Sequence, residues 1–188
     1  MARTTGNIYQ LKITLKDIAP PIWRRLQVRS DTRLSRLHEI LQITMGWTDS
    51  HLHQFEQGDW SYRLPDLDET GDLDDGEDER RVRLSQVLRE PTDRLLYLYD
   101  FGDSWRHDIV LEQVVPPAPG GRYPLCVTGR RACPPEDCGS TWGYTEMLTI
   151  LAQPTHPEYE SMRTWLGRAY NAELFPVGAV NQALSRWW

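Results

Sequence analysis

The sequence predicts an α+β fold, in a single domain whose mostly antiparallel β-sheet has one helix packed on it early in the chain and a helical group at the C-terminal end. Residues 7–130 carry alternating apolar and polar side chains, interrupted by one helical pattern at 31–45. Residues 140–188 carry helical patterns instead. With 188 residues and no repeat, the chain is expected to form one domain over residues 1–188.

The first two strands are expected to pair with each other. Between residues 8 and 18 polar side chains alternate with apolar ones, which is typical of a strand with one buried face: Tyr9, Leu11, Ile13 and Leu15. A second strand is indicated at residues 22–28, with a polar face that includes Arg24 and Arg25. Because a short turn containing prolines separates the two, they should run antiparallel.

A helix should follow from Asp31 to Met45. Ser30 or Asp31 is expected to cap it, since both side chains can accept a hydrogen bond from a free amide. Gly46 is typical of a helix end. Apolar residues recur inside it at helical spacing, which predicts one face against the sheet: Leu34, Leu37, Ile40, Leu41 and Met45.

Residues 97–109 should form a central hairpin. Two aromatic arms, 94–99 and 104–115, surround an Asp-Phe-Gly-Asp sequence at 100–103 that is typical of a turn. If the loop has an odd number of residues, Tyr97 stands opposite His107 and Tyr99 opposite Trp105. An even number brings leucines to that face instead.

Two interpretations of this turn stay open. Asp100 and Asp103 can hydrogen-bond backbone amides, as aspartates often do. Alternatively, Asp100, Asp103 and His107 line a functional site. In that case Glu136 or Asp137, which precede the next predicted helix, would complete a set of candidate catalytic residues for metal-assisted hydrolysis.

Shorter elements complete the pattern. Strands are expected at 60–64 and 123–127, and one or two helical turns at 84–88. Helices should cover 141–152 and start again after a capping-box sequence at 155–158. Pro176 is expected to open a last helix.

Charge is distributed unevenly. Net charge is −6, but nine acidic residues and no basic one lie within residues 66–79. Removing these nine from the 27 acidic residues leaves 18, against 21 lysines and arginines. The acidity argues against a general nucleic-acid binder but not against a local basic face for DNA or an acidic protein partner. Candidates for that face are Arg24, Arg25, Arg29, Arg33 and Arg36.

The acidic segment also resembles a calcium-binding loop. Oxygen-bearing residues stand at the ligand positions of an EF-hand, with Gly71 at the sixth position: Asp66, Asp68, Thr70 and Glu77. A strand pattern precedes it where an EF-hand has a helix, so a solvated acidic loop is the alternative.

Zinc is a second metal hypothesis. On a strand, His51 and His53 would share a face, and the thiolates of Cys133 and Cys138 could complete a tetrahedral site. The alternative is a hydrogen-bonded histidine and reduced, buried thiols, because three cysteines do not form a disulfide framework. No other cofactor is expected.

Aromatic residues are frequent, with eight tryptophans. Most should lie in the core, and some could line a binding cleft together with histidines and aspartates. The candidate ligand- or partner-binding residues are Trp47, His51, His53, Tyr99, Trp105 and Tyr144.

Four ordered stretches resemble a known family: 46–55, from Gly-Trp to His-Leu-His-Gln-Phe; 99–107, Tyr-Asp-Phe-Gly-Asp-Ser-Trp-Arg-His; 133–139, Cys-Pro-Pro-Glu-Asp-Cys-Gly; and 142–144, Trp-Gly-Tyr. Together they resemble the plasmid pRiA ORF-three-like family, also met as an insertion-element passenger protein with a resolvase-like label. The resemblance implies an α+β fold and a bacterial or archaeal source near mobile DNA. It implies no established activity. Ser140 departs from the motif, where a second glycine is common.

Two function classes follow. The first is a binding or accessory module, linked to mobile DNA by resemblance, that acts through an aromatic, His/Asp-lined cleft. The absence of a complete catalytic set favours this non-enzymatic role. The alternative is a metal-dependent hydrolase-like enzyme or zinc-binding protein that uses the His/Asp/Glu/Cys cluster. A cytoplasmic location without a membrane is expected, since no apolar run is long enough to span a bilayer and no signal segment is recognised.

Overall fold

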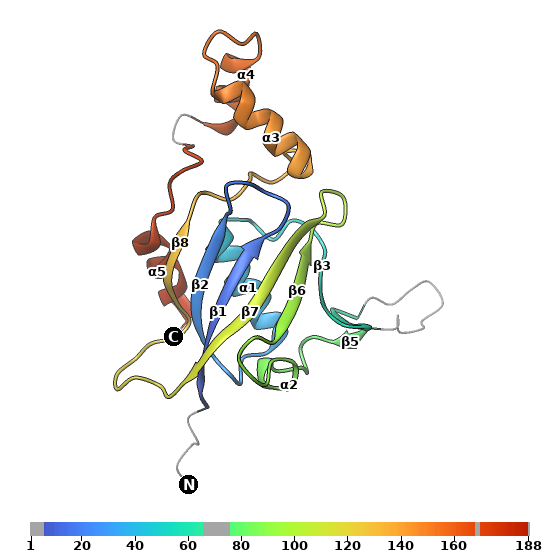
Figure 1. The fold of residues 1–188 in the computed structure, drawn as a ribbon, viewed down its shortest axis with the longest axis vertical. Helices are drawn as coiled ribbons and strands as arrows, with labels where there is room; N and C mark the ends of the chain where they lie inside the picture. The colour runs from blue at the N-terminus through green and yellow to red at the C-terminus, as the bar shows by residue number, and fades with distance from the viewer. Residues whose placement is uncertain (1–5, 66–75, 168–169, 188) are drawn as a thin grey trace.

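The computed structural model describes residues 6–65, 76–167 and 170–187, and it has the predicted α+β architecture (Figure 1). Eight strands form one sheet in the order β5-β4-β3-β6-β7-β1-β2-β8. Among the described strands only β4 and β5 run parallel, so the sheet is mostly antiparallel as predicted. The strands are β1 Ile8–Leu15, β2 Trp23–Arg29, β3 His53–Gln57, β4 Trp60–Arg63, β5 Glu77–Asp78, β6 Arg94–Tyr99, β7 Trp105–Val115 and β8 Leu125–Arg130.

Strands β1 and β2 form the predicted antiparallel pair, with Leu11 opposite Leu26. Their apolar side chains are buried on one face of the sheet. The predicted polar face of β2 is wrong in one respect, because Arg24 is buried on the inner face with Leu26. Neighbouring residues of a strand point to opposite sides, so Arg24 and Arg25 cannot share a face. β8 begins two residues later than the predicted strand at 123–127.

Helix α1, Leu34–Met45, packs its apolar side against the sheet (Figure 1). Gly46 ends it with a left-handed backbone, φ 87°, as predicted. The predicted start is wrong: the N-cap is Arg33, and no side chain caps it. The amides of Leu34 and Ser35 instead donate to the carbonyls of Val82 and Glu79, so a distant segment supplies the acceptors that a capping side chain would otherwise provide.

The central hairpin of β6 and β7 has the odd loop. Tyr99 pairs with Trp105, and Tyr97 pairs with His107, so the loop contains residues 100–104. All four side chains are buried on the same face. These aromatic side chains therefore form a buried layer next to loop 100–104, and Tyr97 in this layer contacts α1.

Three helices follow the sheet: α3 Ser140–Leu151, α4 Tyr159–Leu166 and α5 Val177–Leu184. The α3 and α4 helices stand beyond one end of the sheet, while α5 returns to lie beside β8 (Figure 1). The predicted capping box at 155–158 is wrong, since the N-cap of α4 is Glu158 and its side chain forms no cap hydrogen bond. Two short elements are α2 Leu84–Val87, as predicted, and a 3-10 turn at Ser185–Trp187. Within the described ranges, no helix combines the length and apolarity that a membrane span requires.

Candidate functional site

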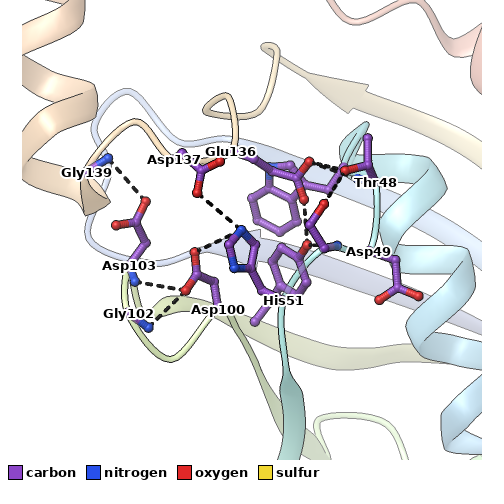
Figure 2. A network of polar contacts seen from close by, with 12 residues as sticks. Thr48, Asp49, His51, Asp100, Gly102, Asp103, Glu136, Asp137 and Gly139 are labelled. Atoms are coloured by element: carbon purple, nitrogen blue, oxygen red, sulfur yellow. Dashed lines mark hydrogen bonds and ion pairs between the residues drawn. The ribbon is translucent and has the colours of Figure 1, made fainter.

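Three loops meet at the end of the sheet next to α3, and His51 lies between them (Figure 2). The loops are 46–52 before β3, 100–104 between β6 and β7, and 131–139 before α3. Each contains a stretch that carried the family resemblance. The fold therefore brings together segments that are far apart in the sequence.

Asp100 is held in place by its own turn. Its Oδ1 accepts hydrogen bonds from the amides of Gly102, at 2.9 Å, and Asp103, at 3.2 Å. Asp103 in turn accepts the amide of Gly139 at 3.2 Å, which ties this turn to the third loop. Both aspartates thus bond backbone amides, as the structural interpretation of the turn expected. The other oxygen of Asp100, Oδ2, faces His51.

His51 stands between two carboxylates (Figure 2). Its Nε2 lies 3.6 Å from Asp100 Oδ2 and 3.4 Å from Asp137 Oδ1. Both separations exceed the usual range for a hydrogen bond, and this buried nitrogen has no hydrogen-bond partner. One ligand atom from each of the three residues lies within 4.8 Å of the others, which is close enough to share a metal ion.

Glu136 belongs to a separate network beside this cluster. The Tyr99 hydroxyl donates to its Oε1 at 2.5 Å, and the Thr48 amide donates to its Oε2 at 3.2 Å. Burial and the neighbouring carboxylate raise the pKa of Tyr99. Partial burial raises the pKa of Glu136, but the bonds from Thr48 and Tyr99 outweigh it and lower the net value. Glu136 is therefore an ionised acceptor whose two oxygens are both occupied.

Trp47, in loop 46–52, connects loop 131–139 to strand β6. Its ring stacks on Tyr99 with centroids 4.9 Å apart, and its Nε1 donates to the carbonyl of Pro134 at 2.9 Å. The side chain is only 7% exposed. One buried indole therefore fixes loop 131–139 to the sheet.

Backbone strain is concentrated in these loops. Non-glycine residues with positive φ in or next to them are Asp49, Asp100, Ser104, Arg131, Asp137 and Ser140. Such conformations persist only where surrounding contacts impose them, and they often occur at functional sites. The two aspartates that face His51 are both in this group.

A second polar cluster is buried behind the first. His38 donates to or accepts from Tyr97 and Asp49, each at 2.8 Å, while His53 contacts Glu79 at 3.0 Å. His38, His53 and Asp49 also lie close enough to hold a metal. The prediction that His51 and His53 share a strand face is wrong, because β3 begins at His53 and His51 lies in the preceding loop.

Four other predicted site residues lie in the core: His107, Cys133, Trp105 and Tyr144. His107 is fully buried, its Nδ1 is 3.3 Å from the carbonyl of Tyr97, and burial lowers its pKa to about 4. The Cys133 thiol contacts Met45 Sδ at 3.6 Å. Burial raises the pKa of Cys133 and Cys138 to about 12. Neither metal-capable cluster in the described ranges contains a cysteine, so the predicted zinc set is not brought together. The candidates Trp105 and Tyr144 are also buried.

The acidic segment is described only in part. Three predicted calcium ligands, Asp66, Asp68 and Thr70, lie outside the described residues. Glu77, the fourth, lies in β5 opposite Tyr62. The expectation that 66–79 is a solvated loop is wrong at its end, because Glu79 is buried against His53.

The five predicted basic residues do not form one face. Arg24 is buried, and Arg33 is exposed at the start of α1. The other three lie in ion pairs that offset their charge: Arg25 with Glu112, Arg29 with Asp31, and Arg36 with Glu39.

Sequence reasoning named His51, Asp100 and Asp137 separately but not as one cluster. It also missed His38, Asp49 and Glu79. Glu79 gave no signal, since it closes a run of acidic residues that is typical of a solvated loop. For His38, a polar residue between Leu37 and Ile40 on the buried side of a helix was a usable signal.

Comparisons with known proteins agree with one another. A family model described as plasmid pRiA4b ORF-3-like protein matches residues 7–179. The uncharacterized protein y4hQ of Sinorhizobium fredii is 39% identical over 181 residues, which is 95% of this chain and 91% of that protein. The crystal structure of the protein of unknown function MM3350 from Methanosarcina mazei Go1 has a TM-score of 0.83 and 38% identity, over 93% of this chain and 97% of that one.

Proposed function

The chain belongs to the plasmid pRiA4b ORF-3-like protein family, and we propose that it is a binding module that holds a divalent metal ion between His51, Asp100 and Asp137. The names of the two relatives state no activity, so the proposal is argued from the geometry of the three-loop cluster alone. Of the zinc hypothesis it keeps His51, omits His53 and both thiolates, and adds two carboxylates.

The spacing of the donor atoms carries this proposal. Nε2 of His51 lies 3.6 and 3.4 Å from the nearest carboxylate oxygens. With metal–ligand bonds of about 2.1 Å, two donors of a tetrahedral site lie about 3.4 Å apart. These distances fit a shared ion better than a direct hydrogen bond. One imidazole and two carboxylates suit zinc or manganese, whereas magnesium and calcium prefer oxygen ligands throughout.

The buried cluster of His38, Asp49 and His53 is the weaker metal site. Both ring nitrogens of His38 already have partners, and so does Nε2 of His53. An ion there would have to replace existing hydrogen bonds inside the core. Nε2 of His51 has no partner to lose.

The loops also support binding over catalysis. Three protein ligands leave one position of a tetrahedral metal open, and an oxygen of a carboxylate or phosphate ligand would fit there. The side chain of Asp137 is 77% exposed, so this position is reachable from solvent. Glu136 is the nearest further carboxylate, but hydrogen bonds occupy both of its oxygens, so it is not free to act as a general base.

A nucleic-acid partner is not part of the proposal. The arginines that favoured one lie largely in ion pairs or in the core. A gel shift with plasmid DNA at low salt that shows retention reversed by salt would restore it.

The direct test is calorimetric titration of untagged, chelator-treated protein with ZnCl2 and with MnCl2. We expect one ion per chain, and at least tenfold weaker binding in His51→Gln and in Asp137→Asn. Asp108→Asn is the matched control, because Asp108 pairs with Arg94 on the sheet and lies outside the site. Equal affinity in His51→Gln and the parent protein would refute the proposal. Loss of binding in His38→Gln alone would move the ion to the buried cluster.

A further inference from the structure

A separate pocket borders loop 131–139. Its cavity volume is about 410 Å³, within the range of small-molecule sites. The end of α1, the prolines of the loop and the segment before α5 enclose it. Its walls are mostly apolar and include Met45, Pro134, Leu166, Phe175 and Val180. Trp165 and Leu174, both about half exposed, also line it.

Among the described residues that line the pocket, Arg24 is the one charged side chain, and it is 1% exposed. Its Nε donates to the carbonyl of Thr44 at 2.8 Å, and its Nη1 donates to the carbonyls of Trp23 and Arg130 at 2.9 Å. None of these three bonds uses Nη2. The ring of Phe175 lies against the guanidinium, with 3.8 Å between Cζ and the ring centroid.

No acidic residue that the structure describes neutralises this charge. In the described parts of the chain, no carboxylate forms an ion pair with Arg24, whereas the neighbouring Arg25 and Arg131 both have one. Cys126 and Cys133 are nearby titratable groups, but burial raises the pKa of their thiols to about 11 and about 12, so both are neutral at pH 7. Buried charges in proteins are usually paired, since an unpaired one is costly. Arginine cannot avoid the cost of burying its charge by deprotonation, because the guanidinium keeps its proton in proteins.

We propose that this pocket binds an amphipathic carboxylate, with the anionic head at Nη2 of Arg24 and the apolar body against the walls of the pocket. Charge complementarity selects the head, since a carboxylate supplies the negative charge that the chain does not. The apolar lining selects the body, because burial of hydrocarbon is favourable there. Aliphatic and aromatic acids share this chemistry.

The site is independent of the metal proposal. Pro134 and Pro135 line the pocket, whereas Glu136 contacts Tyr99 and Thr48, and Asp137 contacts His51, in the three-loop cluster. Neither Arg24 nor Phe175 forms a hydrogen bond, ion pair or ring contact with His51, Asp100 or Asp137. Chelator-treated protein should therefore bind the acid as well as metal-loaded protein does.

The test titrates chelator-treated protein with octanoate, 1-octanol and octylamine, which share a chain and differ in head charge. We expect octanoate to bind at least tenfold more tightly than octanol, and octylamine more weakly still. Val180→Phe, which fills the pocket, should abolish octanoate binding. Val127→Phe is the control, since Val127 is 42% exposed on β8 and does not line the pocket.

Arg24→Lys and Arg24→Met separate charge from shape. Lysine should keep a measurable preference for octanoate over octanol, and methionine should remove it. If either variant fails to fold, the Val180→Phe comparison and the order of the three ligands still decide. Equal binding of octanoate and octanol, or octanoate binding that Val180→Phe leaves intact, would overturn the proposal.

Discussion

His38 lies flat against His53, with ring centroids 3.4 Å apart and an interplanar angle of 2°. Gln42 donates to the Tyr97 hydroxyl at 3.0 Å, so that hydroxyl is left to donate to Nδ1 of His38. Nε2 of His38 then carries the proton and donates to Asp49. The pair is therefore arranged around a neutral His38. Burial, followed by the charge of His53, lowers the pKa of His38.

The first prediction is that acid destabilises the protein through this pair. The pKa of His38 in the folded state lies below the value of about 6.5 of an unfolded chain, so the unfolded chain takes up the proton first as pH falls. Stability from His38 is present above pH 6.5 and is lost below it. Urea unfolding at pH 7.5, 6.5 and 5.5 measures the slope. His38→Gln should flatten the slope while lowering stability at pH 7.5 by about 1–2 kcal/mol. An unchanged slope would contradict this.

The second prediction is that His107 makes the free energy of unfolding depend on pH down to a lower pH than His38 does. Burial lowers its pKa to about 4, and the buried charge of Arg24 acts in the same direction. Between pH 6.5 and 4, His107 is protonated in the unfolded chain but neutral in the folded protein. Its contribution to the free energy of unfolding should therefore decline by about 3 kcal/mol over this range. His107→Leu removes the titration. Its unfolding free energy should depend less on pH in this window than that of the parent, and an identical dependence would rule out His107 as a source.

Trp47 should couple the loops to the core. In Trp47→Phe the carbonyl of Pro134 loses its donor in a buried setting, which should cost about 1–2 kcal/mol in unfolding free energy. If the metal proposal holds, metal affinity should also fall, because loop 131–139 carries Asp137. Thermal unfolding and calorimetry measure the two effects. Trp60→Phe is the control: Trp60 is 63% exposed, so its replacement should change stability by less than about 0.5 kcal/mol. Equal stability of both variants would show that the hydrogen bond from Trp47 to Pro134 does not contribute to the free energy of unfolding.

The sheet could be predicted because its signals are local. Alternation marked β1 and β2. The sequence left the loop parity of the central hairpin open, and the structure shows the odd loop that pairs Tyr97 with His107. Alternation also placed Arg24 with Leu26 on the buried face, but its residue type argued for a polar face. The structure follows the alternation because acceptors from distant elements, the Thr44 carbonyl and the Phe175 ring, surround the guanidinium.

The candidate site could not be assembled from sequence. His51, Asp100 and Asp137 come from three loops, and two of them adopt a left-handed backbone that residue type alone does not predict. His53 was expected to join His51, yet the start of β3 separates them by placing His53 in the core against Glu79. Which polar residues converge depends on loop conformations, and long-range contacts such as the Trp47–Pro134 bond set these.

The last prediction concerns Gly143, which sets the distance between α3 and loop 131–139. A Cβ built there would lie 2.0 Å from the backbone carbonyl oxygen of Cys138, so Gly143→Ala must displace either the helix or the loop. We expect a loss of about 3 kcal/mol in unfolding free energy, together with weaker metal binding at the adjacent Asp137. Denaturant unfolding and zinc titration of the same preparation measure both.

Gly178 in α5 provides the matched substitution. No heavy atom lies within 4 Å of a Cβ built there, and its backbone is helical. Gly178→Ala should therefore stabilise the protein by about 0.5–1 kcal/mol and leave metal affinity unchanged, because alanine restricts the unfolded chain more than glycine does. If Gly143→Ala were as stable as Gly178→Ala, the close approach of α3 to Cys138 would not exist in solution. If it were unstable yet bound zinc normally, the position of loop 131–139 would not control the site.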